Sequence, residues 1–231
     1  VYILKDGEYS KIMKGEFTII GHGINNEIIV EDNDTDFVMA TPGDIWKIAS
    51  HDSTQYGSRL IGNIFLDRRF TFPKSLYAVK DCLYFFVNDK PNAIVVDFFA
   101  GSGTTLHAVN LLNAEDGGHR RCIMVTNNEV SGDEAKSLSG QGYKPGDEEW
   151  NKLGIARYVT WPRTVCSIEG HDVNGKPLKG DYITSGEEPM HMADGFKANA
   201  AFFKLGFLDK NAVALGRQFK ELLPVLWLKA G

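Results

Sequence analysis

The chain has 231 residues, 43% of them hydrophobic and 24% charged, and its formal net charge at pH 7 is −5. These proportions are typical of a globular protein, and no apolar run approaches the roughly 20 residues that would span a bilayer, so we expect no membrane partner. The negative charge argues against binding of nucleic acid through the overall field of the chain. Three widely separated cysteines without metal-ligand spacing predict a reducing, cytoplasmic protein without a metal site.

Residues 1–43 predict a β-rich region. Four short apolar or β-branched clusters lie at 1–4, 17–20, 27–30 and 37–39. Glycine, asparagine and acidic residues separate these clusters as turn signals, so we expect a small β sheet. Residues 50–63 are polar and rich in glycine, and they predict a loop.

A strand–helix–strand unit is predicted in the middle of the chain. Residues 76–86 carry apolar side chains at helical spacing and predict an amphipathic helix, for which Pro73 suits the first turn. Residues 94–97 read I-V-V-D and predict a buried strand, and residues 121–126 predict a second one. A helix expected over 104–113 joins the two, so they should be parallel, as in a right-handed βαβ unit.

The second half of the chain predicts shorter elements. Helices are expected near 131–138 and 147–153, a third strand at 156–161 and a hairpin at Asn174-Gly175. From Gly195 onward apolar residues return at helical spacing, which predicts helices up to residue 227.

The loop after the first strand of the βαβ unit contains Gly101-Ser-Gly103, and it would present backbone N–H groups to an anion. A phosphate-binding P-loop needs a lysine for the terminal phosphates, but no lysine lies between Lys90 and Lys136. A dinucleotide fingerprint needs a third glycine, and Leu106 occupies that position. Both nucleotide classes are therefore disfavoured.

A third ligand, S-adenosylmethionine, is indicated by a family resemblance. The stretch D-F-F-A-G-S-G-T-T at 97–105 resembles the cofactor motif of amino-methylating DNA methyltransferases of the permuted β group. F-T-F-P-K-S at 70–75 resembles the segment that precedes the motif in that group. I-G-N-I-F at 61–65 resembles adenine-N6 methyltransferases, and T-N-N-E at 126–129 and G-I-A-R-Y-V-T-W-P-R at 154–163 resemble the modification (Mod) subunits of type III restriction-modification systems.

The resemblance implies a set of cofactor-binding residues. Gly101 and Gly103 would let the backbone approach the methionine end of the cofactor, where larger residues would block it. Asp97 would bind the cofactor ammonium or orient the loop, and Lys74 would lie near the carboxylate. Aromatic residues shape the turn, and hydroxyl residues bind the carboxylate or cap the helix. The family's ribose-binding acid would fall near Thr126, so Asn127 or Glu129 is expected in that role. The complete predicted set is Lys74, Asp97, Phe98, Phe99, Ala100, Gly101, Ser102, Gly103, Thr104, Thr105, Asn127 and Glu129.

The catalytic motif of the resembled family is missing from this sequence. Amino-methylating enzymes hold the flipped base with a P-P-Y-type loop, but the eight prolines here are never adjacent, so no catalytic residue is predicted. The implied fold is α/β, a partial doubly wound (Rossmann-like) methyltransferase sheet with N-terminal β segments and C-terminal helices. Residues 1–43 would end a target-recognition region, residues 44–168 would form the cofactor-binding half, and residues 169–231 a connection and helical extension.

The implied protein is the C-terminal part of a DNA adenine-N6 methyltransferase of a restriction-modification system, and we expect this part alone to be inactive. The intact protein would act on double-stranded DNA, with a restriction subunit as a candidate partner. Because one edge of the first strand of the βαβ unit would lack its neighbour, we expect it to pair with the N-terminal strands or with a second copy in a homo-oligomer. The alternative is a relic of the fold that serves as a non-catalytic binding or scaffolding module.

Overall fold

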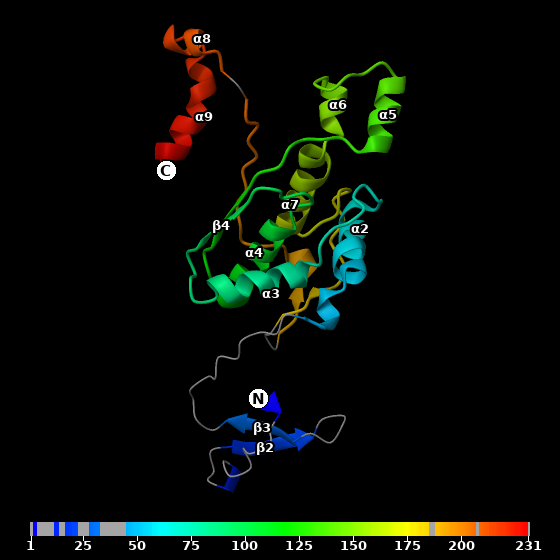
Figure 1. Cartoon of the computed structure of the whole chain (residues 1–231), viewed down its shortest axis with the longest axis vertical. Coiled ribbons are helices and arrows are strands. Elements are labelled where there is room, and N and C mark those ends of the chain that lie inside the picture. Colours follow the sequence, from blue (N-terminus) through cyan, green and yellow to red (C-terminus); the bar gives the residue numbers. More distant parts are fainter. Residues whose placement is uncertain are drawn as a thin grey trace. The chain divides into compact units, whose positions relative to one another are not determined.

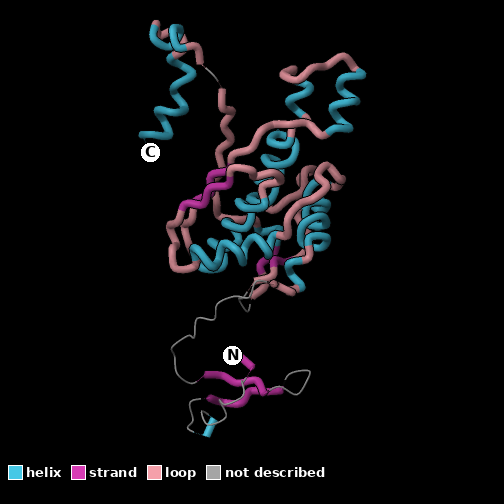
Figure 2. The backbone as a smooth tube through the Cα atoms, in the orientation of Figure 1, coloured by secondary structure: helices cyan, strands magenta, loops and turns pink. Residues whose placement is uncertain are grey.

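The structure is a computed structural model that describes residues 2–3, 12–13, 17–22, 28–32, 45–184, 188–206 and 208–230. The chain divides into two compact units, Val1–Trp46 and Lys47–Gly231. The described residues form a mixture of helices and short strands, so the chain has an α/β fold (Figures 1 and 2). Within those residues, every helix is too short or too polar to cross a membrane.

The first unit contains a three-stranded antiparallel sheet. Its strands are β1 (Tyr2–Ile3), β2 (Phe17–His22) and β3 (Ile28–Asp32), in the order β1-β3-β2. Phe17 and Val30 are buried between them. The predicted strands at 1–4, 17–20 and 27–30 are confirmed, and the one at 37–39 lies outside the described residues. The described N-terminal strands pair with one another, in a sheet separate from that of the βαβ unit.

The second unit begins with helical turns where a loop was expected. Residues 49–65 form η1 (Ala49–His51), the π-helical turn η2 (Thr54–Arg59) and α2 (Leu60–Phe65). Leu60, Ile61, Ile64 and Phe65 are buried, so apolar side chains at helical spacing outweigh the polar, glycine-containing composition. The loop prediction for 50–63 is therefore wrong.

The βαβ unit is confirmed. After α3 (Leu76–Val87), strand β4 (Ile94–Asp97) leads through the Gly loop into α4 (Thr104–Asp116), and β5 (Arg121–Met124) returns parallel to β4. The register sets Ile94 beside Arg121 and Asp97 beside Met124. Helix α3 packs along α4. Its N-cap is Ser75, whose Oγ accepts from the N–H of Ala78 at 3.4 Å, so Pro73 lies before the helix and not in its first turn as predicted.

The third predicted strand, at 156–161, is helical instead. The π-helical turn η3 (Ala156–Thr160) runs directly into α7 (Trp161–Glu169). Val159 and Cys166 are buried in one apolar cluster with α2, and Ile155 packs against it. Apolar spacing of three to four residues across the whole segment therefore overrides the strand preference of the local sequence Y-V-T-W.

The remaining elements follow the predictions in part. The helices α5 (Gly132–Gly140) and α6 (Glu148–Lys152) confirm those expected near 131–138 and 147–153. The turn at Asn174-Gly175 is confirmed, since His171 and Pro177 form an antiparallel bridge around it. Helices do not begin at Gly195, because residues 195–206 are irregular. The last elements of the chain are β6 (Asp181–Tyr182), β7 (Met190–His191), η4 (Met192–Asp194), α8 (Lys210–Ala214) and α9 (Phe219–Ala230).

The segment that follows α7 contributes to the core of the second unit. Tyr182 and Phe196 are buried in one cluster with Leu76 of α3 and with Ala108 and Leu111 of α4. The helix that follows the Gly loop is therefore packed on several sides, and His107, Ala108 and Val109 are each exposed by 2% or less. This burial gives the loop a rigid base.

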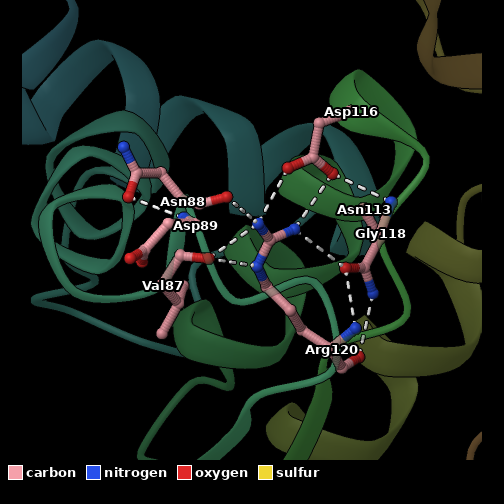
Figure 3. A network of polar contacts seen from close by, with 7 residues as sticks. All are labelled: Val87, Asn88, Asp89, Asn113, Asp116, Gly118 and Arg120. Carbon is pink, nitrogen blue, oxygen red and sulfur yellow. Dashed lines mark hydrogen bonds and ion pairs between the residues drawn. The ribbon is translucent and has the colours of Figure 1, made fainter.

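A buried arginine fastens α3 to the turn between α4 and β5 (Figure 3). The side chain of Arg120 has no exposed surface and forms an ion pair with Asp116 at 2.8 Å. Its guanidinium donates to the carbonyls of Val87 at 2.7 and 2.9 Å and of Asn88 at 3.0 Å, at the carboxyl end of α3, where the Val87 carbonyl also accepts from the N–H of Lys90 at 3.1 Å. Asn113 of α4 also accepts from the backbone N–H of Arg120 at 3.0 Å.

Candidate functional site

The Gly loop lies at the carboxyl ends of two adjacent parallel strands. Beyond the last paired residues, the N–H of Val125 donates to the carbonyl of Asp97 at 2.7 Å, and the N–H of Ala100 donates to the carbonyl of Val125 at 3.2 Å. These bonds attach the loop to the segment after β5, which carries Asn127 and Glu129. Ligands of open α/β sheets bind at this edge, outside the carboxyl ends of the strands.

Two glycines set the path of the loop. Gly101 has φ = 49° and Gly103 has φ = 78°, a left-handed conformation that side chains other than glycine rarely adopt. A Cβ at Gly103 would lie 3.3 Å from Cγ2 of Thr160. Gly103 is also the N-cap of α4 and has no side chain to cap the helix. Gly103 therefore leaves the N–H groups of the first turn of α4 without a side-chain cap. Uncapped N–H groups at the start of a helix favour binding of an anion.

Asp97 holds the two ends of the loop together. One carboxylate oxygen accepts from the N–H of Phe99 at 3.0 Å, and the other accepts from the hydroxyl of Thr105 at 2.6 Å. Two roles were expected for Asp97, and these contacts match the role of orienting the loop. The hydroxyl of Thr105 is bound to the Asp97 carboxylate.

The hydroxyls of Ser102 and Thr104 face the interior. Both residues are buried, at 4% and 5% exposure, and both hydroxyls accept from Nη1 of Arg163, at 3.1 and 2.8 Å. The same nitrogen lies 3.3 Å from the Ser102 carbonyl. Thr160 adds a hydrogen bond from its Oγ1 to the carbonyl of Gly101 at 2.5 Å. The loop is therefore held from behind by η3 and α7, and its inner hydroxyls are occupied.

Behind Arg163, a chain of polar contacts continues into the core. Nη2 of Arg163 lies 3.4 Å from Nδ1 of His107, and Nε2 of His107 lies 2.8 Å from the hydroxyl of Tyr182. Because a guanidinium only donates, Nδ1 accepts and Nε2 carries the proton. Burial, and then the nearby charge of Arg163, lower the pKa of His107 well below 6.5, so this histidine is neutral at pH 7.

The other predicted site residues are exposed. Phe98 and Phe99 have 67% and 94% of their surface exposed beside the loop. Asn127 donates to the carboxylate of Glu129 at 3.1 Å. Lys74 is exposed at the start of α3, and Phe70 of the same segment would lie 3.9 Å from a Cβ at Gly101.

Sequence reasoning missed the supporting residues Thr160, Arg163 and Tyr182. Each comes from a segment more than 50 positions after the loop, and two of them lie where a strand or its end was expected. The available signal was the spacing of Ile155, Val159 and Cys166, which places Arg163 on the inner face of a helix.

Comparison with known proteins shows what this region is similar to. Residues 24–137 match the model of a family described as DNA methylase. This stretch is similar to DNA methylases, and it takes in slightly less than half of the chain. The matched residues include F-T-F-P-K-S at 70–75, the Gly loop and both strands beside it, whereas the supporting residues Thr160, Arg163 and Tyr182 lie beyond the match.

Two similar proteins are Mod subunits of type III restriction-modification enzymes, and a third is a type II methyltransferase. The Mod subunit of the type III enzyme StyLTI from Salmonella typhimurium is 38% identical over 197 residues, which are 77% of this chain and 29% of the relative. The type II methyltransferase M.KpnI from Klebsiella pneumoniae is 41% identical over 81 residues, 34% of this chain and 19% of the relative. The EcoPI Mod subunit from Escherichia phage P1 is 33% identical over 103 residues, 45% of this chain and 15% of the relative.

The predicted resemblance to methyltransferases of restriction-modification systems is confirmed by these matches. The chain spans less than a third of the length of each of these relatives. The match to the StyLTI subunit, at 77% of the chain, is longer than the stretch matched by the family model.

Proposed function

We propose that this chain supplies the methyl-donor-binding part of a DNA adenine-N6 methyltransferase, and that the donor is S-adenosylmethionine. The observation that supports this most directly is the Gly loop. Two glycines with positive φ lead into the uncapped first turn of a 13-residue helix at the carboxyl edge of a parallel strand pair. Such a turn suits the carboxylate of an amino-acid moiety, and the exposed Phe98 and Phe99 suit an apolar or aromatic part of the same ligand.

The residues that would hold the donor divide into two groups. The backbone at Gly101–Thr105 and the exposed aromatics Phe98 and Phe99 would contact it, and Lys74, Asn127 and Glu129 are candidates at the rim. Ser102 and Thr104 would act through their backbone, since their hydroxyls are bound to Arg163. The bound donor supplies an activated methyl group. The chain's own part is to bind and orient that group.

Methyl transfer needs groups that this chain does not carry. No two of its eight prolines are adjacent, so it has no P-P-Y-type loop to hold a target base. We therefore propose that the whole protein methylates adenine in double-stranded DNA, that it works with a restriction subunit, and that this chain alone is inactive. The two-stranded parallel sheet would be part of a doubly wound, Rossmann-like sheet, and a homo-oligomer is the proposed assembly.

Calorimetric titration of the full-length protein with S-adenosylmethionine tests the proposal. Gly101→Asp and Gly103→Asp should abolish binding, because each forces a side chain into left-handed backbone and adds a negative charge at an anion-binding turn. Gly117→Asp is the matched control, because Gly117 also has positive φ (70°) but lies at the other end of α4. Unchanged binding by both loop variants would refute the assignment. If the folded wild-type protein does not bind the donor, the alternative function, a non-catalytic binding or scaffolding module with a relic of the fold, is favoured.

A further inference from the structure

Two arginines are buried in the second unit, and their surroundings differ in charge. Arg120 has an ion pair with Asp116 at 2.8 Å and donates to the end of α3. Arg163 is 1% exposed, and none of the described carboxylates forms an ion pair with it. Its Nε also lacks a hydrogen-bond acceptor among the described residues. Arg120 is therefore compensated within the chain, whereas Arg163 is not.

The charge of Arg163 remains in place at neutral pH. Burial lowers the pKa of the Arg163 guanidinium only to about 10. Its polar neighbours are the hydroxyls of Ser102 and Thr104 and the ring of His107, which is neutral at pH 7. A buried cation without a counter-charge is unfavourable, and such groups are rare unless something else compensates them.

The uncompensated charge lies directly beneath the Gly loop. Nη1 of Arg163 is 2.8 Å from Oγ1 of Thr104, the first residue of α4, and 3.3 Å from the carbonyl of Ser102. The positive end of the α4 dipole is at the same place. Both fields have the same sign, and protein rather than water separates them from the outer surface of the loop. An anion bound there would interact with both through a medium of low dielectric constant.

We propose that Arg163 is a positioning residue that selects the carboxylate of the methyl donor from beneath the loop. The proposal rests on the proposed function, since it assigns a charge partner to the amino-acid end of the same ligand. Arg163 orders the loop by its hydrogen bonds to Ser102 and Thr104, and its charge is neutralised when the carboxylate binds. A neutral residue of similar shape would preserve much of the packing and lose the selection.

Calorimetry of the full-length protein with two ligands separates the charge from the packing. S-adenosylmethionine carries the carboxylate, and decarboxylated S-adenosylmethionine lacks only that group. Wild-type protein should bind the first at least about tenfold more tightly than the second, which corresponds to about 1.4 kcal/mol. Arg163→Gln should weaken binding of S-adenosylmethionine about tenfold and change binding of the decarboxylated ligand less than threefold. Arg163→Lys, which keeps the charge, should retain most of the preference.

Arg120→Met is the control, because it removes an equally buried arginine that already has a carboxylate partner. It should leave the ratio of the two affinities unchanged. Equal weakening of both ligands by Arg163→Gln would show that Arg163 is only structural and would overturn the proposal. If the folded wild-type protein binds neither ligand, the proposed function itself fails, and this inference fails with it.

A measurement on wild-type protein decides the question if Arg163→Gln does not fold. Salt screens exposed charges such as Lys74, whereas a buried charge is screened much less. The preference for the carboxylate should therefore persist when the salt concentration is raised from about 0.1 M to about 1 M. Its disappearance at high salt would assign the selection to exposed lysines and overturn the role of Arg163.

Discussion

Replacing Arg120 with methionine should loosen the junction of α3, α4 and β5 without altering the Gly loop. The guanidinium of Arg120 is the donor for the carbonyls of Val87 and Asn88, and it pairs with Asp116 (Figure 3). Methionine fills a similar volume but offers no donor. The carbonyl of the buried Val87 would lose both of the Arg120 hydrogen bonds described for it.

The size of the effect follows from which groups regain water. The Val87 carbonyl keeps its hydrogen bond from the N–H of Lys90 at 3.1 Å, so the loss is that of its hydrogen bonds from a charged donor, about 1.5–3 kcal/mol. Asp116 is 40% exposed, so its carboxylate can be rehydrated and adds only a small further loss. Together these terms predict a loss of about 2–4 kcal/mol in the free energy of local opening. Since each 1.36 kcal/mol is a factor of ten, opening should become roughly 30 to 1,000 times more frequent.

Hydrogen–deuterium exchange of the full-length protein measures this opening directly. Amides of α3 and α4 should exchange faster in Arg120→Met by that factor, while amides of the N-terminal sheet should not change. Lys152→Met is a control, because Lys152 forms an exposed pair with Glu149 at 3.7 Å, and exposed pairs contribute about 0–1 kcal/mol. Exchange in α3 within threefold of the wild type would refute the reasoning.

Three further predictions concern stability and are tested by thermal or urea unfolding. Gly57→Ala should destabilise the protein by about 1–3 kcal/mol, because its Cβ would lie 2.7 Å from the carbonyl oxygen of Pro73. Gly62→Ala, in α2 with no atom within 4 Å, should instead stabilise by up to about 1 kcal/mol, and equal effects of the two would contradict this contrast. Leu66→Gly should stabilise by about 0.5–1 kcal/mol, because Leu66 is 55% exposed with φ = 62°, and a lower melting temperature would argue against backbone strain there. The hydrogen bond from Arg120 lowers the pKa of the Asp116 carboxyl below 3.8. The stabilisation by this carboxylate is therefore present above pH 3.8 and is lost as the pH falls through the lowered pKa. Asp116→Asn should abolish this part of the acid dependence of stability, and an unchanged acid dependence would count against the pair.

Local patterns were sufficient to predict the βαβ unit and the position of the Gly loop. The apolar run at 94–97, the two glycines and the return of apolar residues at 121–124 each report on backbone that is close in sequence. The loop conformation also follows locally, because left-handed backbone at Gly101 and Gly103 is accessible to few residues other than glycine. The conformation of these segments is decided mainly by residues that are close in sequence.

The failed predictions concern segments whose structure is decided by distant contacts. Residues 54–65 have a polar composition, yet Leu60, Ile64 and Phe65 bury against other elements and impose helical turns. Residues 156–160 contain β-branched and aromatic residues, yet Val159 packs against α2 in a π-helical turn. In both cases tertiary burial outweighs a local preference of about 1 kcal/mol.

Arg163 shows why the least predictable residue of a site can be the most informative. An arginine in a sequence is ordinarily assigned to the surface, because charged side chains are almost never fully buried unless they are paired. Here the side chain is buried against Ser102 and Thr104 without a described carboxylate partner. Arg120 demonstrates that the same fold can pair a buried arginine with an aspartate. The core of this fold can therefore accommodate a carboxylate beside a buried arginine, yet none of the described carboxylates pairs with Arg163. An anion bound at the adjacent turn is the compensation that the geometry favours.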